Sequence, residues 1–423
     1  MHPQREFAVE IVSKLRDAGF LAYFAGGCVR DLLLNRPAKD YDVATSARPD
    51  EVRKLFGHRR TLAVGESFGV IIVLGPKAAG QVEVATFRTD LAYTDGRRPD
   101  GVVFCSPEED ALRRDFTING MFYDPIDSRV IDYVGGEADL ATGIIRAIRD
   151  PFERMREDKL RMLRAVRFTA TLEFQLDPAT ADAVRQMAPQ LSVVSAERIA
   201  QELKKMLVDR HRRRAMELCA DLGLLGEVGI RESGIGFRRE WPEPRDPKPE
   251  TRFPVLALLQ DPGFELSLAA LVLGTPIADV ETLCRRLKLS NDELDRVVWL
   301  VAHQDDLQRA PEMTLSQIKR LLSHRYRDDL LRLAHAKLLA DDADLHPVLF
   351  TEEFLARTPT AVLDPPPLIS GNDLIQSGLR PGPRFKELLE TVRDAQLNLE
   401  VATRGEALAL VRRLQAESAD GTP

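Results

Sequence analysis

The 423-residue chain has few cysteines and no long apolar run. Its four cysteines are scattered without a Cys-x-x-Cys spacing, which argues against a zinc site and against a disulfide framework. Such cysteine usage is typical of a reduced, cytoplasmic protein. The most apolar stretch, Leu266 to Leu273, spans eight residues, whereas a membrane helix needs roughly 20. We therefore expect no membrane-spanning segment, and nothing in the sequence implies a protein partner.

A surplus of positive charge is also missing, because the formal net charge is -7. This balance is unusual for a nucleic-acid binder, since phosphate contacts supply much of the affinity. Arginines are nevertheless concentrated locally: seven lie between Arg146 and Arg167, and another group spans 210–214. A charge run is most often a solvated helix face, and for the second group that interpretation and an RNA contact stay equally open.

The length predicts two to four domains. Short strand-like runs, helices and glycine turns alternate up to about residue 150, after which helical periodicity dominates. We therefore expect an α+β protein, in which an α/β head with a mixed sheet is followed by an elongated all-α part. The expected segments are a head at 1–150, a helical neck at 151–230, a linker or loop rich in proline and charge at 231–253, a helical body at 254–358 and a helical tail at 365–423.

The most informative residues are Asp40 and Asp42. In an extended strand, side chains two residues apart project from the same face, so both carboxylates point into one space. Paired oxygen ligands suit Mg²⁺, which binds through one or two carboxylates together with substrate phosphates. Glu83 lies on another apolar strand and is a candidate third ligand, but an exposed strand glutamate explains it equally well.

A glycine pair precedes these aspartates. Gly26 and Gly27 follow a short apolar strand at Phe20 to Ala25 and precede a helix-like segment at Val29 to Leu34. This order leaves backbone N–H groups free to meet an anion. Strand, Gly-Gly, helix and Asp-x-Asp together predict a pocket for a metal ion and a triphosphate.

The combination Gly26-Gly27-x-Val29-Arg30-Asp31, followed by Asp40-x-Asp42, resembles the signature of the class II tRNA nucleotidyltransferase and bacterial poly(A) polymerase family. The run from Arg113 to Asn119 is similar to the second family motif, which closes the nucleotide pocket and places an arginine near the triphosphate. Gly120 and Met121 stand where an alanine and an apolar residue are usual. By this resemblance residues 1–150 are the catalytic nucleotidyltransferase head, and nucleotide-binding residues in it are Gly26, Gly27, Arg30 and Arg114.

Asp158 and Arg161 belong to the run from Glu157 to Phe168. On a helix they sit three residues apart and share a face. A surface ion pair is the ordinary explanation. An Asp acceptor beside an Arg donor also complements the edge of cytosine or adenine, and mispairs with uracil or guanine at about 1 to 3 kcal/mol per unpaired group. The resemblance implies this second role, because the corresponding residues in the family act as a protein template for the incoming base.

Other residues follow from the resemblance alone. Arg164 and Arg167 continue the same stripe and help to hold the incoming nucleotide. The segment from Ser195 to Leu203 resembles the fifth family motif, which braces the templating helix and is interpreted as structural. The tail at 365–423 is expected to bind tRNA.

The implied function is template-independent addition of C and A from CTP and ATP to the 3′ end of tRNA, with two Mg²⁺ ions held by Asp40 and Asp42. A-only addition and poly(A) synthesis remain alternatives. CC-only addition is disfavoured because Arg88 to Gly101 looks like the loop that CC-only enzymes lack. A non-catalytic RNA-binding protein on the same fold is a more distant alternative.

Overall fold

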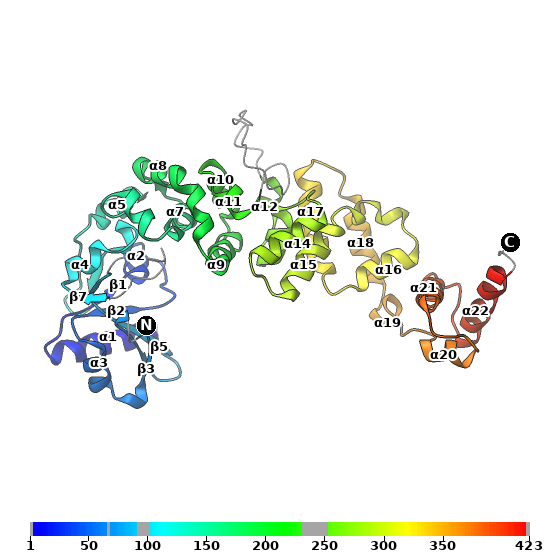
Figure 1. Cartoon of the computed structure of the whole chain (residues 1–423), viewed down its shortest axis with the longest axis horizontal. Helices are drawn as coiled ribbons and strands as arrows, with labels where there is room; N and C mark the ends of the chain where they lie inside the picture. Colours follow the sequence, from blue (N-terminus) through cyan, green and yellow to red (C-terminus); the bar gives the residue numbers. More distant parts are fainter. Residues whose placement is uncertain (1–2, 66–67, 91–101, 231–252, 420–423) are drawn as a thin grey trace. The chain divides into compact units, whose positions relative to one another are not determined.

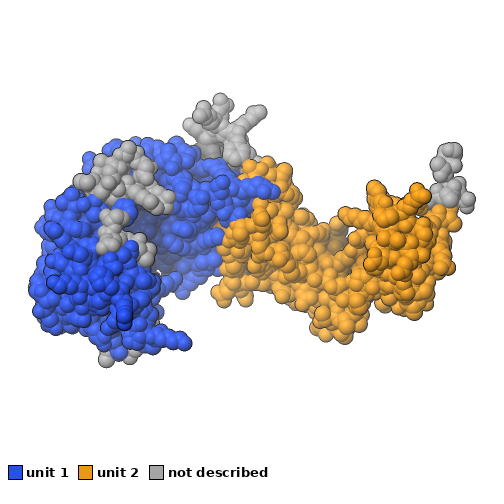
Figure 2. All heavy atoms as spheres, turned by 60° about the horizontal axis from the view of Figure 1, so that its bottom comes forward, with its two compact units in different colours: residues 1–252, 283–289 blue, residues 253–282, 290–423 orange. Residues whose placement is uncertain are grey.

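The computed structural model describes residues 3–65, 68–90, 102–230 and 253–419 (Figure 1). The chain forms two compact units, coloured separately in Figure 2. The first comprises Met1–Arg252 and Leu283–Leu289, and the second Phe253–Thr282 and Ser290–Pro423. The predicted linker at 231–253 lies outside the described residues apart from Phe253, as does the predicted loop beyond Asp90.

A mixed sheet forms the centre of the head. Its strand order, among the described residues, is β3-β4-β5-β2-β1-β8-β9. Strands β2 and β5 are parallel, and the other neighbouring pairs are antiparallel. The strands are β1 (Ala22–Ala25), β2 (Asp42–Thr45), β3 (Thr61–Gly65), β4 (Val70–Leu74), β5 (Gln81–Thr86), β8 (Phe122–Asp124) and β9 (Arg129–Ile131).

Alternating burial explains these strands. On β4, Ile71 and Val73 are buried, and on β5, Val82 and Val84 are buried while Glu83 between them is exposed. Helix α1 (Pro3–Asp17) contacts β1, β2 and β5 through a buried stripe spaced four residues apart. The other head elements are α2 (Gly27–Leu33), α3 (Pro49–Phe56), β6 (Arg88–Asp90), β7 (Val102–Phe104), α4 (Pro107–Leu112) and α5 (Gly136–Thr142).

Helices dominate after residue 150, which confirms the expected α+β class. The first unit continues with β10 (Ile144–Ile145), α6 (Pro151–Glu157), α7 (Leu160–Leu172), β11 (Gln175–Leu176), α8 (Pro178–Met187), α9 (Ala196–Leu207), α10 (Arg212–Asp221) and α11 (Leu224–Val228). The expectation that Asp158 and Arg161 lie on one helix is wrong, because the helical periodicity of residues 152–171 is divided between α6 and α7. The helix breaks at Asp158, whose φ of -142° and ψ of 104° are extended. Its carboxylate accepts a hydrogen bond from the Leu160 N–H, and such local bonds compete with helix continuation.

The second unit is helical throughout its described residues. Its elements are α12 (Pro254–Leu258), α13 (Phe264–Leu271), α14 (Ile277–Arg286, whose end belongs to the first unit), α15 (Asn291–Ala302), η6 (Asp306–Glu312), α16 (Leu315–Ser323), α17 (Arg327–Ala340), α18 (His346–Arg357), α19 (Thr360–Leu363), α20 (Gly371–Gln376), α21 (Pro383–Leu397) and α22 (Arg404–Ala419). A separate apolar cluster joins α20, α21 and α22. Within the described chain, none of the helices combines the length and apolar character that a membrane crossing requires.

Candidate active site

The glycine pair connects β1 to α2. Gly26 has a φ of 72°, a conformation that favours glycine, and a Cβ placed there would lie 3.3 Å from Nη1 of Arg114. From α2, Arg30 donates from Nη1 to Oδ1 of Asn119 at 2.9 Å and from Nη2 to Oδ1 of Asp31 at 2.7 Å. The turn therefore brings the backbone of Gly26 close to Arg114, while α2 directs Arg30 toward Asn119.

Three carboxylates lie at the start of β2 and on the neighbouring strand. Asp42 pairs in register with Glu83 across the parallel β2–β5 contact, and Asp40 precedes Asp42 by two residues. Burial, the largest cause, and the charges of Glu83 and Asp40 together raise the pKa of Asp42 to about 6, although Arg114 lowers it. The carboxylates are therefore close enough to repel one another, a repulsion that a cation would relieve.

This donor set suits a hard divalent cation, because all three groups offer carboxylate oxygens. Across the residues that the structure describes, no three His, Cys, Asp or Glu side chains form a complete metal cage. A site completed by substrate phosphates and water fits these residues, and this is how Mg²⁺ is usually bound. Glu83 is the carboxylate that sequence reasoning did not assign, because its alignment with Asp42 depends on the strand order.

The raised pKa of Asp42 predicts an effect on stability. Between about pH 4 and 6 the folded chain holds a proton that the unfolded chain releases, so the free energy of unfolding falls as pH rises through this window. Asp42→Asn removes this loss. Although protein surrounds much of the Asp42 carboxylate, the residue keeps contact with solvent, which screens its charge. We therefore expect a gain of at most about 1 kcal/mol at neutral pH without divalent cations, or roughly 2 °C in the unfolding midpoint. Thermal unfolding at about pH 7.5 and 4 measures it. The gain should vanish at the lower pH, and a gain of equal size at both would contradict the assignment.

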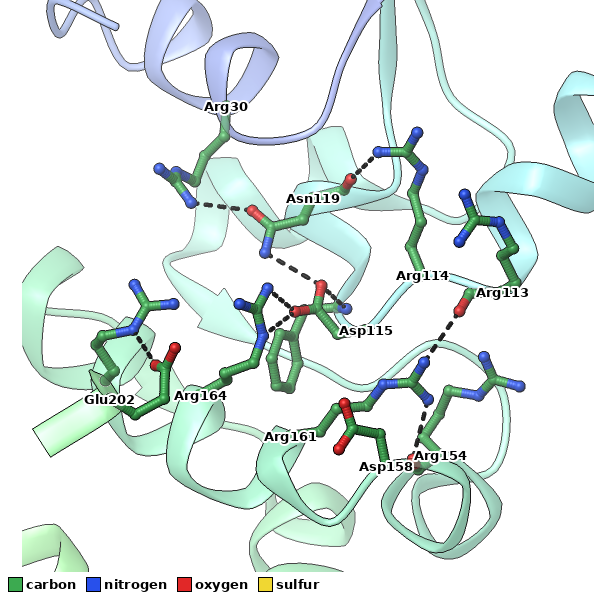
Figure 3. Close-up of polar contacts among 12 residues, drawn as sticks. Arg30, Arg113, Arg114, Asp115, Asn119, Arg154, Asp158, Arg161, Arg164 and Glu202 are labelled. Carbon is green, nitrogen blue, oxygen red and sulfur yellow. Dashed lines mark hydrogen bonds and ion pairs between the residues drawn. The ribbon is translucent and has the colours of Figure 1, made fainter. Parts of the chain in front are cut away.

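Charged groups of α4 and of the loop after it form ion pairs, and Figure 3 draws the pair between Asp115 and Arg164. Asp110 binds Arg113 at 2.8 Å and Arg114 at 2.9 Å. Asp115 binds Arg164 at 2.5 Å and also accepts the Phe116 N–H. Burial would raise the pKa of Asp115, but Arg164 outweighs it and lowers that pKa to about 2. The loop is therefore anchored to helix α7, and its carboxylates are ionised at neutral pH.

Gly120 follows this loop where the resemblance leads us to expect an alanine. A Cβ at this position would lie 2.7 Å from Cγ2 of Val134 and 3.0 Å from Cδ1 of Ile148. Contacts this short force a neighbour to move. A side chain at this position would have to displace these methyl groups, which is a packing reason for glycine in place of the expected alanine.

Asp158 and Arg161 have partners that the sequence did not predict. Arg198 on α9 donates from Nη1 and Nη2 to the two oxygens of Asp158, at 3.1 and 2.7 Å. Arg161 donates from Nη1 to Glu157 and to the Arg154 carbonyl, and from Nη2 to the Arg113 carbonyl. Asp158 and Arg161 are therefore not held by each other, as a surface ion pair between them would require. Each is fixed in place by other neighbours.

A cavity of about 480 Å³ in the first unit gathers most of the predicted site. Its lining includes the predicted residues Gly26, Gly27, Arg30, Arg114, Asp158, Arg161 and Arg164, together with Arg113, Asp115, Asn119, Leu160, Phe168 and Arg198. Asp40, Asp42 and Arg167 are not among the lining residues. Arg167 instead binds Glu202 at 2.6 Å and lies over the Phe168 ring.

Arg198 was interpreted from sequence only as part of a bracing motif, yet it lines the cavity. Arg198 lies four residues before Glu202 on α9, so the two side chains share one face of that helix. This spacing is the sequence signal that could have predicted a role for Arg198. By contrast, the second arginine group is engaged elsewhere: Arg212 and Arg214 donate to backbone carbonyls and Arg213 binds Glu217. Arg212 and Arg214 therefore tie α10 to neighbouring segments, whereas Arg210 is largely exposed beside Glu173.

Sequence profiles of two known domains match the chain. The Poly A polymerase head domain matches residues 22–146, and the probable RNA and SrmB-binding site of polymerase A matches residues 173–228. The fold and the cavity thus belong to a nucleotidyltransferase of the poly(A) polymerase type.

Similarity over the full length narrows this class. The CCA-adding enzyme of Geobacillus kaustophilus is 34% identical over 96% of both chains, and that of Bacillus licheniformis is 44% identical over 52% of this chain and 55% of its own. The crystal structure of the Bacillus stearothermophilus CCA-adding enzyme in complex with CTP has a TM-score of 0.77 at 30% identity, covering 99% of this chain and 100% of that one. The chain belongs to the CCA-adding enzyme family, which confirms the resemblance seen in its motifs.

Proposed function

We propose that this protein adds C and A, taken from CTP and ATP, to the 3′ end of tRNA and selects both bases without a nucleic-acid template. The observation that carries the proposal is that Asp158 and Arg161 line the same cavity as the Gly26-Gly27 turn and Arg114. One cavity then accommodates both the base and the triphosphate of one nucleotide. Full-length similarity to CCA-adding enzymes supports the same activity.

Base selection follows from the hydrogen bonds that remain open. A guanidinium has five N–H groups, and described residues engage three of those on Arg161, so two can meet a base. Oδ1 of Asp158 accepts from both Arg198 and the Leu160 N–H, whereas Oδ2 accepts only from Arg198 and keeps capacity for a base. Asp158 accepts the amino group of cytosine or adenine, and Arg161 donates to the adjacent ring nitrogen. Uracil and guanine would set acceptor against acceptor and donor against donor.

Phosphoryl transfer would take place beside the Gly26-Gly27 turn of the cavity, because Ala25 next to this turn pairs in register with Asp42. The RNA 3′ oxygen forms a bond to the α-phosphorus, the bond to the β-phosphate oxygen breaks, and pyrophosphate leaves with the electron pair. Asp40 and Asp42, with Glu83 beside them, would hold divalent cations, for which Mg²⁺ is the proposed ion. Such ions, when bound, lower the pKa of the hydroxyl and neutralise the leaving charge. Arg114, at the turn, and Arg30 would hold the phosphates.

The extent of addition is tested with three tRNA transcripts, ending before CCA, after C and after CC. Each is offered labelled CTP or ATP alone. Complete CCA addition predicts two C residues on the first transcript, one on the second and a single A on the third. A-only addition extends only the third, whereas poly(A) synthesis adds a ladder of A residues to all three. Failure to extend any transcript would refute the proposal.

Arg198 acts in this account as a positioning residue for Asp158. Arg198→Ala leaves the carboxylate without its two-point partner, so we expect the ratio of kcat/KM for CTP over UTP to fall roughly tenfold, the scale of one charged hydrogen bond. Lysine at this position should restore part of the ratio. The matched control is Arg185→Ala, which removes an exposed arginine paired with Asp182. Equal selectivity in the two alanine variants would contradict the assigned role.

A further inference from the structure

The second unit contains a cavity of about 440 Å³ that shares no residue with the active site. It lies where the end of α15, η6 and α16 meet. Its lining residues are Trp299, His303, Asp306, Arg309, Glu312, Met313, Gln317, Arg320, Leu321 and His324. This set combines aromatic rings, cations and carboxylates, whereas a gap left by imperfect packing would be lined by apolar groups.

Aromatic rings form one side of this cavity. The rings of Trp299 and His324 stack with centroids 3.9 Å apart and planes 9° apart, and the His303 ring lies 4.6 Å from Trp299. The Tyr326 N–H donates to Nδ1 of His324, which places the ring proton on Nε2. Burial, followed by His303 and Arg325, lowers the pKa of His324. The ring is therefore neutral at pH 7 and offers one N–H donor.

Some charged side chains around the cavity are held in ion pairs, and others are open to a ligand. Arg320 is bound by Glu390 and Asp394, each at 2.7 Å, and Asp306 is bound by His303 at 2.5 Å. Arg309 is exposed and has no ion pair or hydrogen bond to any residue in the described part of the chain. Glu312 also lines the cavity, is exposed and has no ion pair among the described residues, so the cavity presents one available cation and one available carboxylate beside an aromatic wall.

We propose that this cavity binds one unpaired nucleotide of the RNA substrate, with its base against the aromatic wall and its phosphate at Arg309. The inference rests on the proposed function, which supplies the RNA. Single-stranded RNA is recognised by unstacked bases that pack on aromatic rings and by cations that meet the backbone. A free nucleoside triphosphate fits less well, because one cation faces several phosphate charges. A chain with a net charge of -7 also needs such local contacts to hold RNA.

Tryptophan fluorescence tests the base contact directly. The chain has two tryptophans, so Trp241→Phe leaves Trp299 as the only reporter. Titration with a tRNA transcript ending before CCA should quench its emission with the same midpoint as binding followed by gel shift, whereas CTP alone should leave the emission unchanged. Binding of tRNA without any change in Trp299 emission would overturn the inference, and so would quenching by CTP alone.

A pair of arginine variants tests the phosphate contact. Arg309→Ala should weaken tRNA binding roughly tenfold, the scale of one hydrogen bond to a charged group, and leave the rate of CTP addition at saturating tRNA unchanged. Arg357→Ala is the matched control, because it also removes one exposed arginine, which pairs with Glu353 outside the cavity lining. Equal weakening in both variants would show general electrostatics and overturn the site. If the unaltered chain adds CTP normally and the Arg309→Ala variant binds tRNA as tightly as the control variant, only this site is refuted. If the unaltered chain adds no nucleotide, the proposed function itself is refuted.

Discussion

Asp42→Asn is expected to lower the rate of nucleotide addition by roughly a thousandfold or more, while the chain stays folded. The substitution keeps the size of the side chain but removes the charge that would hold a divalent cation, and such ions supply several kcal/mol of transition-state stabilisation. Single-turnover addition of labelled CTP to a tRNA transcript measures the loss, and circular dichroism reports the fold.

The matched control for this change is Asp17→Asn, which neutralises an exposed carboxylate at the end of α1 in the same unit. It should keep full activity. Glu83→Gln tests whether Glu83 is a third ligand of the cation. If it is, the rate of nucleotide addition should fall, but less than in Asp42→Asn. Retained addition by Asp42→Asn would contradict the site.

Asp158→Ala is expected to lose discrimination more than turnover. Each mispaired group against UTP costs the intact cavity about 1 to 3 kcal/mol, so removal of the acceptor should lower the preference for CTP over UTP by 10- to 100-fold. The preference for ATP over GTP should fall in parallel. Addition of each nucleotide to a defined tRNA end, measured as kcat/KM, gives both ratios.

Glu153→Ala provides the control for that experiment, because Glu153 is exposed on the neighbouring helix α6. Its ratios should equal those of the unaltered protein. If Asp158→Ala lowered kcat for all four nucleotides equally and left the ratios intact, Asp158 would be a structural residue and the base-reading account would fail.

The sequence predicted the local elements of the head well, because each has a clear local signal. The predicted strand from Phe20 to Ala25 ends where β1 ends, and the predicted helix from Val29 to Leu34 overlaps α2, which begins two residues earlier. The break at Asp158 was missed, since helical periodicity continues through it and only the side-chain bond to Leu160 interrupts the helix.

Partners distant in sequence could not be predicted from local patterns. Asp115 and Arg164 lie 49 residues apart, and Asp158 and Arg198 lie 40 apart. Their contacts depend on how α7 and α9 pack on the head. The role of Glu83 beside Asp42 likewise depends on the parallel pairing of two strands that are not consecutive in the chain.

These ion pairs also explain how a chain with negative net charge can offer an arginine-rich cavity. Asp110 holds two arginines of the loop, Asp115 holds Arg164, and Asp158 holds Arg198. Paired arginines are held in a defined geometry before a nucleotide arrives, and preorganised groups lose less entropy on binding. The sign of the whole-chain charge therefore says little about this site.

The central claim is that the protein itself selects C and A. Equilibrium binding of the four nucleoside triphosphates to the protein in the complete absence of RNA tests it most directly. The account predicts that CTP and ATP bind at least roughly tenfold more tightly than UTP and GTP, the scale of one mispaired group. Equal affinity for all four would contradict it.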